Sequence, residues 1–215
     1  MKYIDFLYSL LFCLRYLPIK QAMKVPILIS YKVKTNLFRG AIVIDSPKIY
    51  RYMITFGYKG YSLIPSSESL LSIEHGGKLL IEGKAVFAQG HRIWIQEGSN
   101  LVIGKNFYCN KNCMLRCSDD IIFGNDVLIG WDVSFNTTDG HHVIEKGEER
   151  LNHGVIRIGN HIWIASDSKF QKNSEVPDFS VIAQSSLITK KFTLLNSLIG
   201  GVPAKLLKTS ISWKI

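Results

Sequence analysis

The chain has 215 residues, 47% of them hydrophobic, and its 26 Lys and Arg side chains exceed its 17 Asp and Glu side chains by nine. This length favours one domain with a terminal extension, and the apolar content is enough for a large core. Its four cysteines do not indicate a disulfide framework, which favours the reducing cytoplasm. Only the charge suggests nucleic acid, so nucleic acid is not an expected partner.

The first predicted element is a helix within a basic, apolar segment at residues 1–30. Residues 1–60 hold ten Lys and Arg against Asp5 and Asp45, and the longest uncharged run, residues 6–14, has nine residues. This run is too short to span a bilayer, and no small-residue cleavage site follows it. Two interpretations stay open. The helix lies on the inner surface of a membrane, with basic side chains near anionic lipid, or it covers an open end of the fold.

Residues 31–75 are expected to form irregular early strands or coils, and residues 76–190 a regular repeat. Near the end of that range, apolar side chains stand six positions apart, at Ile158, Ile164, Phe170, Val176, Ile182 and Ile188. The side chains four positions after these are mostly small: Ile162, Ser168, Ser174, Ser180, Ser186 and Phe192. A period of six fits neither an α-helix nor a plain alternating strand. It is typical of an all-β solenoid whose short parallel strands turn a corner every six residues, three to a coil of about 18 residues.

Departures from the repeat predict insertions. Gly104 and Gly124 are 20 residues apart, so two residues bulge from that coil. Gly130 and Gly159 are 29 residues apart, so about 11 residues beyond one coil leave the solenoid. Solenoids place such insertions on one functional face. We therefore expect an extruded loop at about residues 136–156, which contains Thr138-Asp139-Gly140-His141-His142.

The cysteine run at Cys109, Cys113 and Cys117 allows two interpretations. The regular spacing suggests metal ligands. The six-residue register instead places Cys109 inward and Cys113 at a corner, where cysteine acts as a small hydrophobic side chain. Cys117 falls outside this pattern. The register therefore favours core packing over a metal site.

The last predicted element is a cap at residues 191–215. Gly200 and Gly201 predict a turn, and Pro203 predicts the start of a short helix over residues 204–208, because proline suits the first helical position. The expected fold is therefore an all-β solenoid with an N-terminal helical or irregular extension and a short C-terminal helical cap.

Four segments resemble one protein family. They are Gly104-Lys-Asn-Phe-Tyr-Cys-Asn110, Val127-Leu-Ile-Gly-Trp-Asp132 followed by Thr138-Asp-Gly-His141, Ile158-Gly-Asn-His-Ile-Trp163-Ile-Ala, and Ile199-Gly-Gly-Val-Pro203-Ala-Lys. Together they are similar to the hexapeptide-repeat O-acetyltransferases, in particular the branch that modifies bacterial surface polysaccharides, over roughly residues 76–208. Two positions depart from the family pattern: Val202 replaces an Asn, and His142 stands where many relatives have Pro.

The resemblance implies a left-handed parallel β-helix, a homotrimer with active sites between neighbouring subunits, and acetyl-CoA as the donor, with no metal. It assigns His141 as the general base, and histidine suits this role because its ordinary pKa of about 6.5 is close to working pH. His142 either shapes the acceptor site or substitutes as the base. Asp139 either orients an imidazole or forms a turn with Gly140, and we favour the turn.

The resemblance also implies contacts with both substrates. Asn110, His142 and Trp163 would meet the acceptor, although Asn110 can equally be a turn residue. The implied contacts with the oxyanion or with CoA are Trp163, Ala165, Ser166, Ala183, Gln184, Thr189, Lys190, Lys191 and Lys205. Of these, a backbone amide near Ser166 would stabilise the oxyanion. The lysines would meet CoA phosphates or are ordinary solvated side chains.

The register also predicts where one tryptophan points. Ile162 and Ile164 take inward positions, so Trp163 points outward, where it lines the donor channel or packs against another subunit. Trp131 shares this ambiguity.

The function that follows from the resemblance is transfer of an acetyl group from acetyl-CoA to a sugar hydroxyl of a surface polysaccharide or a lipid-linked sugar. Three alternatives stay open. One is an N-acetyltransferase acting on an amino sugar or nucleotide sugar. Another is a γ-type carbonic anhydrase, in which zinc would need three histidines among His141, His142, His153 and His161. The last is a non-catalytic trimeric scaffold.

Overall fold

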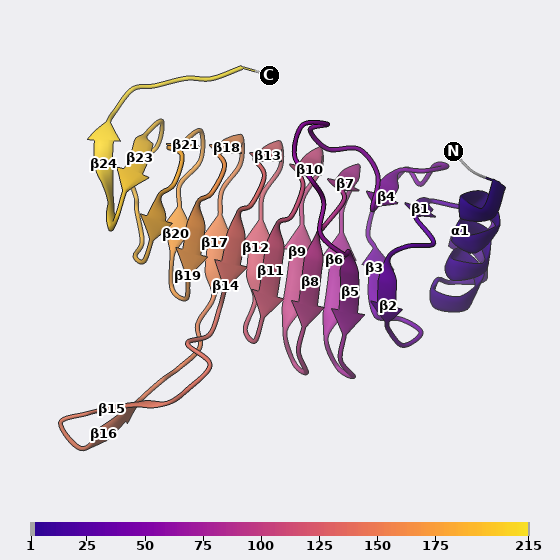
Figure 1. Cartoon of the computed structure of the whole chain (residues 1–215), viewed down its shortest axis with the longest axis horizontal. Helices are drawn as coiled ribbons and strands as arrows, with labels where there is room; N and C mark the ends of the chain where they lie inside the picture. The colour runs from indigo at the N-terminus through magenta and orange to yellow at the C-terminus, as the bar shows by residue number, and fades with distance from the viewer. Residues whose placement is uncertain (1–2, 215) are drawn as a thin grey trace.

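The computed structural model describes residues 3–214, so Met1, Lys2 and Ile215 of the predicted terminal segments lie outside the described range. Three sheets of parallel strands run side by side along one long axis (Figure 1). Each circuit of the chain adds one strand to each sheet in turn. The molecule is therefore a three-sided parallel β-helix.

We call the three sheets A, B and C. Sheet A contains β1 (Ile27–Ile29), β4 (Ile54–Phe56), β7 (Ala85–Phe87), β10 (Phe107–Cys109), β13 (Val127–Ile129), β18 (Ile162–Ile164), β21 (Val181–Ile182), β23 (Leu198–Gly201) and β24 (Ala204–Lys208). Sheet B contains β2 (Lys34–Asn36), β5 (Leu70–Ile73), β8 (Arg92–Ile95), β11 (Met114–Cys117), β14 (Ser134–Asn136), β19 (Lys169–Gln171) and β22 (Leu187–Ile188). Sheet C contains β3 (Ile42–Ile44), β6 (Lys78–Ile81), β9 (Asn100–Ile103), β12 (Ile121–Phe123), β17 (Ile156–Ile158) and β20 (Glu175–Val176).

Alternation along these short strands fills the interior. In β18, Ile162 and Ile164 are fully buried and Trp163 points outward, as the register predicts. Six phenylalanine rings form an interior column with neighbouring centroids 4.5–5.3 Å apart: Phe56, Phe87, Phe107, Phe123, Phe135 and Phe170. Such pairs contribute about 0.5–1.5 kcal/mol each beyond area burial.

The corners explain the small residues of the repeat. Four corner residues have a left-handed backbone, with φ values from 56° to 63°: Asp167, Asn173, Phe179 and Ser185. The serine that follows each of them is buried. At one such corner, Ser168 Oγ and Ser186 Oγ donate to Ala183 O at 3.1 and 2.6 Å. A larger side chain there would displace this packing, which is why small residues recur.

Strands in register with the rest of the stack begin at Ile27, so the range 31–75, where irregular strands or coils were expected, already belongs to the β-helix. Residues 57–69 leave the stack between β4 and β5, and this insertion hides the six-residue spacing of the first coils. The register near the second insertion also differs from the expected one. A Cβ on Gly124 would lie 2.8 Å from Gly159 O, so Gly124 packs on Gly159, which lies 35 residues later.

The predicted helix after Pro203 is wrong, because residues 204–208 form strand β24. β24 pairs antiparallel with β23. The pairing supplies partners to backbone groups that the last strand of sheet A would otherwise leave exposed at an edge. The C-terminal cap is thus a hairpin instead of a helix.

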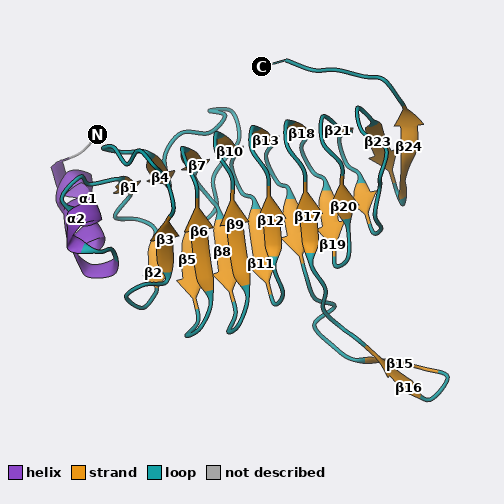
Figure 2. Cartoon of the chain, turned by 180° about the vertical axis from the view of Figure 1, so that it is seen from behind, coloured by secondary structure: helices purple, strands orange, loops and turns teal. Residues whose placement is uncertain are grey.

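Two helices, α1 (Tyr3–Tyr16) and α2 (Ile19–Ala22), lie against the N-terminal end of the stack (Figure 2). Ser9 Oγ accepts a hydrogen bond from Ile29 N at 3.0 Å, and Asp5 Oδ1 accepts one from Tyr31 N at 3.2 Å. One face of α1 therefore covers the end of the fold. Within residues 3–214, neither helix combines the length and apolar character that a membrane span requires.

All four cysteines are buried free thiols. Burial raises the pKa of Cys13 to about 11, and it also raises the pKa of Cys109. The cysteine run therefore packs in the core. In the described part of the chain, no three His, Cys, Asp or Glu side chains are grouped so as to hold a metal ion.

Candidate active site

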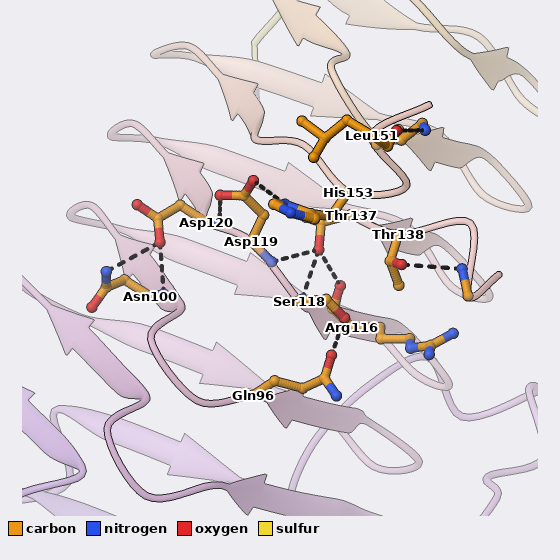
Figure 3. Close-up of polar contacts among 12 residues, drawn as sticks. Gln96, Asn100, Arg116, Ser118, Asp119, Asp120, Thr137, Thr138, Leu151 and His153 are labelled. Carbon is orange, nitrogen blue, oxygen red and sulfur yellow. Dashed lines mark hydrogen bonds and ion pairs between the residues drawn. The ribbon is translucent and has the colours of Figure 1, made fainter. Parts of the chain in front are cut away.

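A loop leaves the edge between sheets B and C after β14 and returns at β17. Its outer part is an antiparallel hairpin of β15 (Val143–Glu145) and β16 (Glu148–Arg150) (Figure 1). At its base, Asp139 N donates to Asn152 O at 2.8 Å. Thr137 Oγ1 accepts hydrogen bonds from the backbone of Ser118 and Asp119 (Figure 3). The loop therefore starts from a fixed base.

The two adjacent histidines of this loop have different surroundings. The His142 ring pairs with the carboxylate of Glu149 on β16. His141 is exposed, and its ring makes no hydrogen bond or ion pair within the described residues. Of the two rings, His141 has both nitrogens available to a substrate.

The backbone bends at Gly140, next to Asp139, in keeping with the turn favoured from the sequence. Gly140, with φ of 82°, donates its N–H to Thr138 Oγ1 at 3.0 Å. The Asp139 carboxylate lies 2.5 Å from Lys172 Nζ. Asp139 is therefore held by a lysine and does not orient either imidazole.

A third histidine, which the sequence suggested only as a possible zinc ligand, lies at the base of the loop. His153 Nδ1 lies 3.0 Å from Asp119 Oδ2, and both side chains are partly buried (Figure 3). The two residues are 34 positions apart and meet only because the loop closes. No local motif could have identified this pair.

A second group of expected site residues lines the edge between sheets A and B. Backbone hydrogen bonds stack Asn110, Gly130, Ala165 and Ala183 in successive coils. Ser166 follows Ala165 at this edge, and its Oγ accepts a hydrogen bond from Trp131 N at 3.3 Å. The Ser166 N–H donates to no acceptor among residues 3–214. It is therefore available to an oxyanion.

Asn110 has a structural role that the sequence did not reveal. Its Oδ1 accepts hydrogen bonds from Tyr61 N at 3.0 Å and Lys111 N at 2.9 Å. The Tyr61 ring also stacks on Trp131, with centroids 5.4 Å apart. Asn110 therefore anchors the loop at residues 57–69, and only its Nδ2 remains for an acceptor.

Trp163 lies on the outer face of sheet A under the C-terminal tail. The ring is 41% exposed, and the Trp213 ring lies 6.3 Å away. Trp213 is held in place because its ring stacks on His161 at 4.4 Å and its Nε1 donates to His161 O at 3.0 Å. A channel along Trp163 would therefore have Trp213 as a second wall, which the sequence could not indicate.

The three expected phosphate-binding lysines share one cavity of about 240 Å³ at the C-terminal end of the stack. Lys190 and Lys191 follow β22, and Lys205 reaches the cavity from β24. Lys191 Nζ lies 3.7 Å from the Glu175 carboxylate, and Lys190 Nζ lies 5.4 Å from the Phe192 ring centre. The pairing of β24 with β23 is what brings Lys205 to this cavity.

The expected site residues therefore fall into separate groups within one chain. Thr189, Lys190 and the loop of His141 follow the ends of sheet B strands. Ala165, Ser166, Ala183 and Gln184 follow the ends of sheet A strands, and Gln184 Nε2 donates to Asp167 at 3.5 Å. The width of sheet B separates the two edges, so a single chain does not bring His141 to Trp163 or Ser166.

Comparison with known proteins places these features in context. No family model matches the chain. It is 32% identical to the galactoside O-acetyltransferase of Escherichia coli K12 over 134 residues, which cover 58% of this chain and 65% of that protein. It is 31% identical to the sophorolipid acetyltransferase of Starmerella bombicola over 112 residues, 52% of this chain and 43% of that protein. The matches thus span less than two thirds of each relative.

Solved structures share the architecture. The polySia-specific acetyltransferase NeuO superposes with a TM-score of 0.67 at 18% identity, covering 88% of this chain and 79% of that one. A hexapeptide-repeat acetyltransferase of Vibrio cholerae, solved with acetyl coenzyme A, gives a TM-score of 0.51 at 21% identity, covering 62% and 70%. At these identities the likeness concerns the fold, and the predicted left-handed parallel β-helix is confirmed.

Proposed function

We propose that this chain, which belongs to the hexapeptide-repeat acyltransferase family, moves an acetyl group from acetyl-CoA to a sugar hydroxyl of a bacterial surface polysaccharide. The observation that carries the proposal is the extruded loop, which presents the unpaired ring of His141, while a free backbone amide at Ser166 lies at a different edge of the stack. The sequence relative is a sugar O-acetyltransferase by name, and the fold neighbour is an acetyltransferase of a polysaccharide.

In the proposed reaction, His141 takes the proton from the sugar hydroxyl as the oxygen attacks the thioester carbonyl carbon. The carbonyl oxygen becomes negative, and the Ser166 N–H would donate to it. When the C–S bond breaks, the imidazolium returns the proton to the CoA thiolate. The acetyl ester and free CoA are the products.

The donor would lie along the C-terminal coils. Lys190, Lys191 and Lys205 line one cavity and supply positive charge for CoA phosphates. Trp163 and Trp213 would flank the pantetheine, with Ala165, Ala183, Gln184 and Thr189 at the coil ends that the donor passes. These small and polar residues leave room for an extended ligand close to the backbone.

The site would be completed by a second copy of the chain in a homotrimer. The strands of sheet A from β1 to β21 contain no charged residue. Their outward side chains form an apolar row in which Tyr108, Leu128, Trp163 and Val181 are in register. A neighbour packed beside this row would bring its His141 loop to the Ser166 edge of the first copy.

The acceptor would be a glycan or a lipid-linked sugar handled in the cytoplasm, at the inner membrane surface. Ile4, Leu7 and Leu11 form an exposed apolar stripe on α1, opposite the face that covers the stack. Asp5 is buried, and Lys20 and Lys24 are exposed nearby. An exposed apolar stripe in a segment that also exposes basic side chains suits peripheral contact with anionic lipid.

Transfer of labelled acetyl groups from acetyl-CoA to a panel of oligosaccharides tests the function. His141→Ala should lower the rate by about 10²–10⁴-fold, the usual contribution of a general base. His142→Ala is the matched control, because the neighbouring ring is already paired with Glu149. Loss of activity in His142→Ala alone would move the base to His142, and transfer to no acceptor by the unmodified chain would contradict the proposal.

A further inference from the structure

The outer face of sheet B is basic and lies beside the base of the His141 loop. Its outward side chains include Arg92, Arg116 and Lys169, and strands β5, β8, β11, β14, β19 and β22 contain no Asp or Glu. Arg116 lies against the loop itself, since a Cβ placed on Gly140 would be 3.9 Å from Arg116 Nη1. The next residue after Gly140 is the proposed base.

The Arg116 guanidinium is held in place but has no acidic partner among the described residues. Its Cζ lies 5.3 Å from the ring centre of Trp94 on the neighbouring strand, and Trp94 Nε1 donates to Glu74 Oε1 at 2.8 Å. Among the described residues, the guanidinium makes no ion pair and its buried Nε has no hydrogen-bond partner. Stacking on Trp94 fixes the guanidinium plane and leaves donors free.

The acidic side chains around Arg116 already have partners. Asp119 lies 3.0 Å from His153, and Asp139 lies 2.5 Å from Lys172. Glu74 accepts from Trp94 and from the backbone of Glu97. The positive charge of Arg116 is therefore not neutralised by any side chain in residues 3–214, although it stands next to the proposed catalytic loop.

We propose that Arg116 binds a carboxylate of the acceptor, so that the acceptor is an acidic sugar. The proposal rests on the transfer reaction described above. A planar guanidinium recognises a carboxylate through two parallel hydrogen bonds, which fixes the orientation of the sugar as well as its position. On the adjacent strand, Asn136 Oδ1 is buried and has no hydrogen-bond partner among the described residues. Rotation of this amide toward the surface would let it accept a hydrogen bond from a hydroxyl of the same ring. Together these contacts hold another hydroxyl toward His141.

Calorimetric binding tests the acidic acceptor without relying on turnover. The probes are oligosaccharides containing glucuronic acid or sialic acid, each compared with its carboxyl methyl ester. Arg116→Gln should weaken binding of an acidic probe by about 10- to 100-fold, the range for hydrogen bonds to a charged group, and leave binding of the ester unchanged. Arg92→Gln is the matched control, because Arg92 lies on the same face of sheet B. Arg116→Lys should restore only part of the affinity.

Several results would overturn the role of Arg116. These are equal affinity for acid and ester, an equal loss in Arg92→Gln, or no binding of any acidic probe at millimolar concentration. If Arg116→Gln and Arg92→Gln have equal melting temperatures, a difference in their affinity for the acidic probe reports carboxylate recognition and not loss of folding. Label transfer from acetyl-CoA is measured in parallel. Arg116-dependent binding without transfer would contradict the proposed function alone, and transfer to neutral sugars regardless of Arg116 would contradict only the acidic acceptor.

Discussion

The outer face of α1 gives a quantitative prediction for binding to a membrane surface. Ile4, Leu7 and Leu11 lie on one stripe and are 51%, 51% and 64% exposed. Burying a fully exposed leucine contributes about 1.5–3 kcal/mol, and the exposed parts of Leu7 and Leu11 together amount to a little more than one side chain. Replacing both by Asp should therefore cost about 2–3 kcal/mol of partitioning free energy, or roughly 30- to 150-fold in affinity.

Sedimentation with vesicles measures this effect. The unmodified chain should bind vesicles that contain anionic phosphatidylglycerol more tightly than neutral phosphatidylcholine vesicles, and salt should weaken the binding. Leu194→Asp with Leu195→Asp is a matched control, because these leucines at the far end of the stack are 51% and 52% exposed. Equal vesicle binding by both double variants, or no preference for anionic lipid in the unmodified chain, would refute membrane contact through α1.

Three further predictions concern the fold and the loop. Burial lowers the pKa of His91 from 6.5 to about 4. Because the unfolded chain takes up this proton at higher pH than the folded chain, the unfolding free energy should fall as pH falls through this window, by at most about 3 kcal/mol. In His91→Asn, denaturant titrations should no longer show this loss of unfolding free energy at low pH. The same pH dependence in the variant and in the unmodified chain would contradict the prediction. Asp139→Asn should lower transfer less than about tenfold, whereas a loss like that of His141→Ala would give Asp139 an orienting role. Gly124→Ala should cost about 1–3 kcal/mol of stability in chemical denaturation, because the new methyl would overlap the backbone of the next coil, and unchanged stability would refute that stacking.

Most of the fold was predicted from the six-residue repeat. The apolar side chain of each hexad faces inward and the serine four positions later is buried at a corner, as Ser168 and Ser186 illustrate. This regularity exists because every coil meets the same geometric constraint. The first coils escaped prediction because the insertion at residues 57–69 separates their strands by an irregular distance. Likewise, Pro203 is suited to a helix start by local sequence, but residues 204–208 instead pair with the open edge of β23.

The candidate site was predictable only where its chemistry is local. The loop with His141 followed from a broken spacing and a short motif. Other site residues have roles that depend on partners distant in sequence. Asn110 binds Tyr61, and Arg116 stacks on Trp94, 22 positions earlier. Such pairs are neighbours because parallel strands of successive coils lie in register. Their identification requires the coil lengths, which the insertions obscure.

Mixed assembly of two inactive variants tests most directly whether two copies share one active site. His141→Ala removes the base, and Ser166→Pro removes the N–H proposed for the oxyanion, whereas the control Ser166→Ala keeps that N–H. Each of the first two should be inactive alone. Co-assembled through separate affinity tags, they should regain a measurable part of acetyl transfer, because some seams join an intact imidazole to an intact amide. Folded mixed assemblies without activity would contradict a shared site.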